Sequence, residues 1–282
     1  MDNRKLRVLV RHRGAMAGLA MVVLFGLLAG VIGWLSPYDA VQIEQGDRLT
    51  TGRFLPPSGS HLLGTDHAAR DLFTRIFYAA RLSLLIGVLC VVFSGLLGIA
   101  LGAVAGYFGG WVDLAISRFI DILLSFPSVL LAIAIAAPMG ASLKTVILAV
   151  GIVGVPQFAR QVRASVLALR EQDFVTASHA LGAGHGRILF LDILPNAMGP
   201  IIVLATLGVG SSILTAAGLS FIGLGVEAGR PEWGAMLHDG YTDRERSPYP
   251  ALFSGLAISL AVLGFNLFGD GLRDALDPKS IR

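Results

Sequence analysis

Two stretches of this chain, residues 82–112 and 193–226, contain no charged residue and consist mainly of apolar residues and glycine. A helix needs about 20 apolar residues to cross the hydrocarbon core of a bilayer, so each stretch is long enough to span it. Over the whole sequence 54% of residues are hydrophobic and 15% are charged, whereas soluble domains carry about 25% charged residues. The pattern predicts an all-α polytopic membrane protein.

Six transmembrane helices are expected from the uncharged stretches. The third continues a span that begins near Asp113. The fourth is shorter than a bilayer requires, and Lys144 and Arg160 at its ends would extend their charged groups to the membrane surface. The six predicted spans are residues 14–35, 82–112, 122–143, 145–159, 193–226 and 247–269.

Basic residues predict the orientation of these spans. A cluster of lysine and arginine directly precedes the first span, and such clusters remain on the cytoplasmic side. Six crossings return the C-terminus to that side, where Arg273, Lys279 and Arg282 are found. The expected order is a cytoplasmic segment 1–13, a first span 14–35, an external loop 36–80, a five-helix core 81–270 and a cytoplasmic tail 271–282. Within the core, residues 170–196 are expected to be cytoplasmic and residues 227–246 to form an external loop.

The rest of the composition argues against several classes of function. The net charge is only +3 and no basic patch is interleaved with aromatic residues, which argues against nucleic-acid binding. A single cysteine, Cys90, excludes an internal disulfide or a cysteine metal cluster. There is no G-x-x-x-x-G-K-[ST] phosphate loop, so the chain is not expected to hydrolyse ATP. No serine–histidine–aspartate, zinc or paired-carboxylate set shares a span, and we expect no catalytic residue, metal site or cofactor.

A stripe of glycines in the second span predicts close helix packing. Gly98, Gly102 and Gly106 recur every four residues and therefore share one helix face. In lipid, helices associate through close backbone contact over small residues rather than through the hydrophobic effect. The stripe is expected to contact another helix, either within this chain or in a partner.

Prolines and charges within the third and fourth spans suggest local features. Pro127 and Pro156 remove backbone hydrogen bonds and are expected to kink their helices, with or without a role in gating. Arg118 and Asp121 are three residues apart, a spacing that allows an ion pair on one helix face.

Residues 171–196 form a polar, glycine-containing segment between two apolar spans. No helix breaker interrupts residues 170–181, and Gly182 is positioned to end this helix in a left-handed cap. A second short helix is expected from Arg187 to Pro195, where the next span begins at a bend. Such a short helix, held across the membrane plane, predicts a surface offered to a soluble partner.

This segment resembles the coupling motif of ATP-binding-cassette importer permeases, written E-A-A, three residues, G, then I-x-L-P. The spacing from Gly182 to Pro195 matches, while Thr176, Ala177 and Ser178 occupy the E-A-A positions. The version of the dipeptide, oligopeptide and nickel branch is matched more fully, although Asp192 stands where histidine is common. Its matching residues here are Phe174, Val175, Ala177, Ala180, Leu181, Gly182, Ala183, Arg187, Ile188 and residues 193–196.

Three further stretches resemble the same branch. Residues 63–66, followed by Arg70 and Asp71, are similar to an external L-G-T-D-x-x-G-R-D motif with Ala69 in the glycine position. Residues 218–225, together with 232–234, are similar to the region around the fifth span. Residues 266–278 are similar to the ending of the second permease subunit. The resemblance extends from about residue 5 to the end of the chain.

The resemblance implies a subunit of a multi-pass importer in the bacterial inner membrane. Its expected partners are a second homologous permease, two cytoplasmic ATPases, an external substrate-binding protein and the lipid bilayer. Residues 176–186 would dock in a cleft of an ATPase, and closure of the ATPase pair would move the attached helices. The residues expected to couple this chain to the ATPase are Phe174, Val175, Thr176, Ala177, Ser178, Ala180, Leu181, Gly182, Ala183 and Pro195.

The substrate and two other classes of transport protein stay open. Short peptides are the favoured substrate, and nickel or a metal chelate comes second. Nickel is considered because it binds imidazole, and His61, His67 and His238 are expected outside. No substrate-binding residue is identified. An ion-coupled secondary transporter would need buried acids or broken helices in paired positions. A channel that works without ATP is the other alternative.

Overall fold

The computed structural model describes residues 3–41, 52–227 and 229–276. In these ranges the chain is helical, with loops between the helices and one isolated antiparallel bridge joining Thr65 to Asp71. The elements are α1 (Asn3–Arg11), α2 (Arg13–Leu35), α4 (Leu72–Phe108), α5 (Gly110–Leu124), α6 (Ser128–Ala136), the 3-10 turn η1 (Ala137–Met139), α7 (Leu143–Arg170), α8 (Asp173–Ala180), α9 (His185–Arg187), the π-helical turn η2 (Ile188–Ile193), α10 (Leu194–Phe221), α11 (Trp233–Thr242) and α12 (Tyr249–Leu276).

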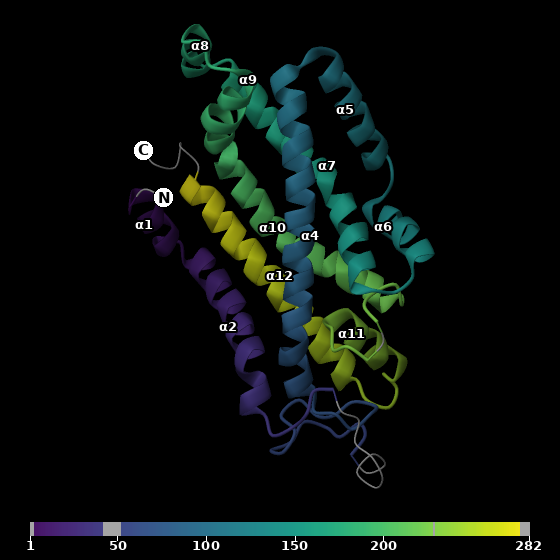
Figure 1. The fold of residues 1–282 in the computed structure, drawn as a ribbon. Helices are drawn as coiled ribbons and strands as arrows, with labels where there is room; N and C mark the ends of the chain where they lie inside the picture. Colours follow the sequence, from purple (N-terminus) through teal and green to yellow (C-terminus); the bar gives the residue numbers. More distant parts are fainter. Residues whose placement is uncertain (1–2, 42–51, 228, 277–282) are drawn as a thin grey trace.

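Five helical segments are long and apolar enough to cross a bilayer, and a bent pair can supply a sixth span. The five are Arg13–Leu35, Leu72–Phe108, Leu143–Arg170, His185–Phe221 and Tyr249–Leu276. Helix α4 lies in the middle of the bundle, with α2 and α12 beside each other on one side and α5, α6 and α7 on the other (Figure 1). The predicted all-α membrane fold is therefore confirmed.

The third predicted span is broken rather than continuous. Helix α5 ends at Leu124, α6 begins at Ser128, and the two segments are bent by 89°. Pro127 explains the break, since it lacks an N–H group and its ring disfavours helical geometry at the preceding residue. The expected kink at Pro127 is thus a change of direction, and residues 122–143 do not form one helix.

The fourth predicted span is longer than residues 145–159. Helix α7 contains 28 residues and continues through Pro156 to Arg170. Ser142 begins it, since its hydroxyl accepts a hydrogen bond from the Thr145 N–H at 3.1 Å. Arg160 therefore lies within the helix rather than at its end. Charge alone misplaced the boundary, because arginines can continue a helix wherever they find acidic partners or reach water.

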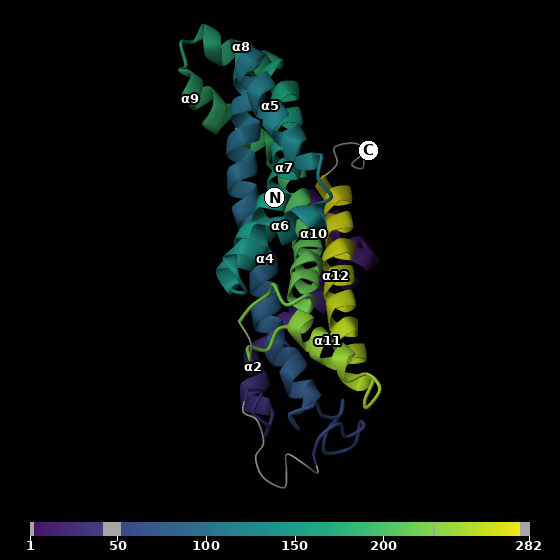
Figure 2. The same cartoon turned by 90° about the vertical axis from the view of Figure 1, so that its right-hand side faces the viewer.

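Helix α4 is much longer than a bilayer requires. Its 37 residues extend about 55 Å at roughly 1.5 Å per residue, whereas the hydrocarbon core is about 30 Å thick. At one end of the bundle, α4, α5 and α7 project beyond the ends of α2 and α12, and α8 lies at this end (Figures 1 and 2). We call this the α8 end; α1 and the last turns of α12 also face it.

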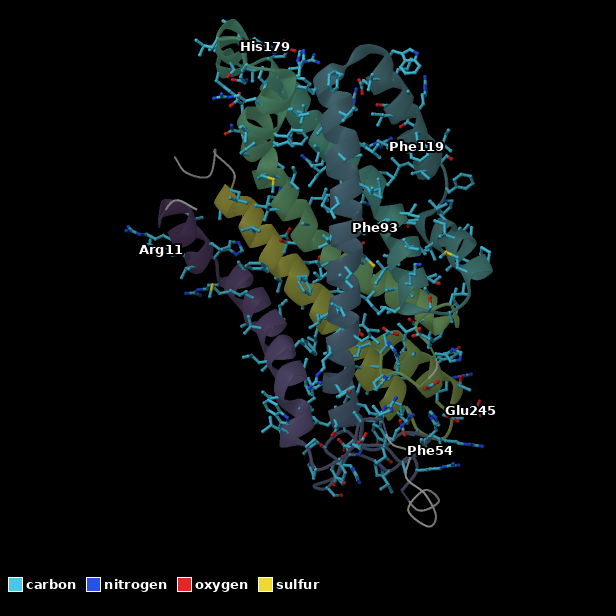
Figure 3. All side chains as sticks on the ribbon, in the orientation of Figure 1. Arg11, Phe54, Phe93, Phe119, His179 and Glu245 are labelled. Atoms are coloured by element: carbon cyan, nitrogen blue, oxygen red, sulfur yellow. The ribbon has the colours of Figure 1, made fainter. Side chains whose placement is uncertain are left out.

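The opposite end of the bundle, the α11 end, is closed by loops and by α11. Trp233 is completely buried, and its Nε1 donates a hydrogen bond to the Ile76 carbonyl at 2.9 Å. Glu232 caps α11 by accepting hydrogen bonds from the N–H groups of Gly234 and Ala235. Residues 227–246, expected as a loop, therefore include a helix. Phe54 and Glu245 mark this end in Figure 3.

The predicted loop 36–80 is also shorter than expected, because α4 begins at Leu72. Asp71 sets this start by accepting a hydrogen bond from the Thr74 N–H at 2.8 Å. Just before it, Asp66 accepts a hydrogen bond from the Arg70 backbone and pairs with the Arg70 guanidinium at 2.8 Å. Ala69 has a φ of 58°, a left-handed conformation in which glycine is favoured.

Candidate functional site

Helix α8 is a short helix at the far tip of the α8 end, where Figure 3 labels His179. It ends as the sequence predicts, with Gly182 at a φ of 79°. The Gly182 N–H donates to the His179 carbonyl at 2.9 Å, and the Ala183 N–H donates to the Ser178 carbonyl at 3.0 Å. This pair of hydrogen bonds is a Schellman motif, which stops the helix and reverses the chain.

The two faces of α8 differ in exposure. Val175 is 1% exposed and belongs to the apolar cluster that also contains Val166 and Ile188. Leu181, in contrast, is 88% exposed and Phe174 is 39% exposed. Thr176, Ala177, Ala180 and Gly182 are exposed as well. One buried valine therefore attaches α8 to the bundle, while a face of small and apolar residues is left open.

Helix α8 is connected to α10 through α9 and a π-helical turn. Pro195 has no N–H group, and its ring would clash with the carbonyl four residues earlier in a regular α-helix. The chain accommodates Pro195 by widening residues Ile188–Ile193 into the π-helical turn η2. The Asn196 side chain donates to the Asp192 carbonyl at 2.7 Å. The helical segment runs without a break from His185 through Pro195 to Phe221.

The glycine stripe of α4 lies against α7. A Cβ atom added to Gly98 or Gly102 would come well under 3.0 Å from Phe158 or the Ala159 carbonyl, respectively. One added to Gly106 would lie 2.9 Å from the Arg163 carbonyl. Each of the three positions therefore lacks room for a side chain, and the stripe allows the backbones of α4 and α7 to approach closely.

Two ion pairs join α5 to α7. The Arg163 guanidinium donates two hydrogen bonds to the Asp113 carboxylate, from Nε to Oδ1 at 2.5 Å and from Nη2 to Oδ2 at 2.7 Å. Asp121 binds Arg160 at 2.7 Å, so the predicted pairing of Asp121 with Arg118 is wrong. The facing helix presents a guanidinium to Asp121, whereas the spacing within α5 only makes a pair with Arg118 possible. Bidentate arginine–carboxylate contacts are among the stronger polar contacts in proteins.

The surface of α5 and α6 is rich in exposed apolar side chains. Phe119, which Figure 3 labels on α5, is 52% exposed. Neighbouring side chains exposed by at least 55% are Trp111, Leu114, Ile122, Phe126 and Leu130. A large exposed apolar patch is typical of an interface with lipid or with another protein.

The histidines expected outside do not gather into a metal site in the described part of the chain. No group of three or more histidine, cysteine, aspartate or glutamate side chains is suitably placed there. His61 binds Asp71 at 3.0 Å instead, and its ring lies 4.7 Å from that of Tyr38. Cys90 is buried and free.

Comparison with protein families gives the assignment. Residues 98–282 match the family described as binding-protein-dependent transport system inner membrane component. The chain belongs to this family. Residues 4–57 also match the N-terminal transmembrane domain of oligopeptide transport permease C. The protein is thus a permease subunit of an ATP-binding-cassette importer, and not an enzyme. The alternatives of an ion-coupled transporter and a channel are excluded.

Similar proteins and structures agree with this assignment. The dipeptide transport system permease protein DppC of Alkalihalophilus pseudofirmus is 48% identical over 96% of this chain and 88% of its own length. The glutathione transport system permease protein GsiD of Pectobacterium atrosepticum is 44% identical over 97% of this chain and 89% of its own. A chain of the inward-facing MetNI methionine ABC transporter shares the fold, with a TM-score of 0.60 and 18% identity. That alignment covers 73% of this permease and 98% of the MetNI chain.

Two polar features of the site were not found from the sequence. One is the pair of Arg163 with Asp113, and the other is a hydrogen bond at 2.8 Å between the Tyr107 hydroxyl and Nδ1 of His185. The residues of each pair are 50 and 78 positions apart. No local spacing rule joins residues so far apart. The only available signal was the presence of charged or polar residues near the ends of long apolar helices.

Proposed function

We propose that this permease forms a translocation path for short peptides together with a second homologous permease. A binding protein outside the cell would deliver the substrate, and two ATPases inside it would drive the cycle. The similarity to permeases named for dipeptide and glutathione transport supports peptides. Nickel or a metal chelate is a weaker candidate, since the two relatives at 44% and 48% identity are named for dipeptide and glutathione transport.

The exposed face of α8 is the proposed docking site for an ATPase. The face combines small side chains, which permit close backbone contact, with the exposed apolar groups of Phe174 and Leu181. The Schellman turn at Gly182 holds it in a defined shape, and Val175 anchors it to the bundle. An ATPase that binds α8 would therefore move α7, which precedes α8, and α10, which follows it after α9 and η2. Nucleotide-driven closure would shift the permease pair between outward and inward access.

The membrane orientation follows from the same proposal. An ATPase is soluble and cytoplasmic, so α8 must face the cytoplasm of a bacterial cell. Helix α1 and the last turns of α12 face the same end of the bundle (Figure 1), which supports both termini on the inner side of the plasma membrane. The α11 end would then face the external binding protein.

The apolar surface of α5 and α6 is the proposed contact with the second permease. The Arg160–Asp121 pair lies beside it, with side chains 58% and 48% exposed. A charged pair directed toward lipid would be costly, whereas one beside a partner or a water-filled path is tolerated. The apolar groups and the pair together favour a protein partner over lipid on this surface.

The docking proposal is tested by charge and bulk on α8. Ala177→Arg or Ala180→Arg places a long cation where close contact is required, and we expect transport by the reconstituted complex to fall at least tenfold. Ala168→Arg, at another exposed alanine, on α7 outside α8, is the control and should transport normally. Copurification of the second permease without the ATPases would indicate lost docking, whereas loss of both partners would indicate lost folding. Full transport by Ala177→Arg would overturn the proposal.

Orientation and substrate have separate tests. In membranes that contain the permease without its ATPases, Leu181→Cys in a Cys90→Ser background should react with a membrane-impermeant maleimide only from the cytoplasmic side, because Leu181 is highly exposed when no ATPase covers it. Reaction from outside would contradict the topology. Unlabelled glutathione and other short peptides should compete with a labelled dipeptide for uptake. Nickel uptake without peptide uptake would support the metal alternative.

A further inference from the structure

The α8 end contains a side-chain connection that bypasses the polypeptide chain. Tyr107 lies in the last turn of α4, a helix that neither directly precedes nor follows α8 in the sequence. Its hydroxyl is 2.8 Å from Nδ1 of His185, the first residue of α9. The hydrogen bond therefore links α4 directly to the segment that leaves α8.

The rings around this hydrogen bond extend the connection to α8 itself. The Tyr107 and His185 rings meet edge to face at 5.7 Å, which fixes the imidazole. The His185 ring also meets the ring of His179 at 5.8 Å, and His179 belongs to α8. A contact series thus runs from α8 through His179 and His185 to Tyr107 of α4.

Helix α4 is firmly held where this series reaches it. The Arg170 guanidinium donates to the carbonyls of Gly106 and Tyr107 at 3.2 and 3.1 Å. Those carbonyls have no further partner in the helix, because α4 ends at Phe108. Gly106 also packs closely against the backbone of α7 at Arg163. The end of α4 and the end of α7 therefore behave as one body beneath α8.

We propose that Tyr107 and His185 are positioning residues that transmit movement of α8 to α4. This inference rests on the proposed docking of an ATPase on α8. Without the hydrogen bond, the segment would be joined to the bundle by the packing of Val175 and Ile188 and through α10; the hydrogen bond adds a directional link to α4. With it, a displacement of α8 moves α4, α7 and α10 together.

The hydrogen bond contributes more to transmission than to stability. Tyr107 is 6% exposed, but His185 is exposed, so water can replace either partner after a substitution. Tyr107→Phe keeps the buried ring and removes only the hydroxyl. We therefore expect this variant to fold and assemble normally, with an unchanged melting temperature.

The test measures substrate transported per ATP hydrolysed by the complete reconstituted importer. Tyr107→Phe and His185→Leu should each lower this ratio about fivefold, the lower end of the usual range for coupling between two sites. The double variant should be no worse than either single variant, because both remove the same connection. His185→Asn retains an acceptor near the position of Nδ1 and should restore most of the ratio.

Controls separate this inference from the docking proposal. Tyr249→Phe removes a tyrosine hydroxyl at the α11 end, beside Phe253, and should leave the ratio unchanged. If Ala177→Arg uncouples the importer but Tyr107→Phe and His185→Leu do not, the transmission role is wrong and docking stands. If Ala177→Arg also has no effect, the docking proposal itself fails. Additive losses in the double variant would likewise overturn a shared hydrogen bond.

Discussion

The contact between α4 and α7 makes a quantitative prediction at Gly102. A Cβ atom at this position would come well under 3.0 Å from the Ala159 carbonyl and lie 2.9 Å from the Val162 Cβ. Neither atom can rotate away, because one belongs to the backbone of α7 and the other is fixed to it. Gly102→Ala must therefore push the two helices apart over their shared length.

The expected cost follows from the kind of strain. Adding atoms to a closely packed core costs about 1–3 kcal/mol, and contacts with backbone place Gly102→Ala in the upper half of that range. Gly95→Ala is the matched control on the same helix, since its Cβ would lie 3.7 Å from the Phe158 ring. That distance is an ordinary contact, so the control should be neutral or slightly stabilising, as alanine favours helix over glycine.

Thermal unfolding of the purified complex in detergent measures the difference. A loss of about 2–3 kcal/mol should lower the melting temperature by roughly 4–10 °C, while Gly95→Ala should remain within about 2 °C of the original protein. Equal melting temperatures for Gly102→Ala and Gly95→Ala would refute the close approach of α4 to α7 at this point.

Two further predictions concern left-handed positions and have opposite signs. Ala69 adopts a φ of 58°, a conformation that costs a non-glycine residue about 1–2 kcal/mol. Glycine avoids this strain but loses more backbone entropy on folding, so Ala69→Gly should stabilise the protein by about 0.5–1 kcal/mol. The measurement is a higher melting temperature. A lower one would contradict the strain. Gly182, at a φ of 79°, should show the reverse. Gly182→Ala should destabilise the end of α8 by about 1–2 kcal/mol and increase proteolytic cleavage there. Unchanged cleavage would argue against the left-handed cap.

Local sequence signals predicted the parts of this permease that depend on neighbouring residues. The first span was expected at residues 14–35, and α2 occupies Arg13–Leu35. The end of α8 at Gly182 was also predicted, because a left-handed cap depends on one glycine and the turn before it. The membrane fold followed from composition and span length. These features share one physical basis: the preference of each segment for lipid, water or a particular backbone conformation.

Tertiary structure alone decided which segments meet. Pro127 predicted a change in helix direction, but only packing set the angle of 89° between α5 and α6. Asp121 had an apparent partner three residues away and binds Arg160 on another helix instead. Tyr107 and His185 carried no mutual signal at all. Hydrophobic periodicity and spacing describe one helix at a time, whereas ion pairs and hydrogen bonds between helices depend on how far each helix extends and how it rotates against its neighbour.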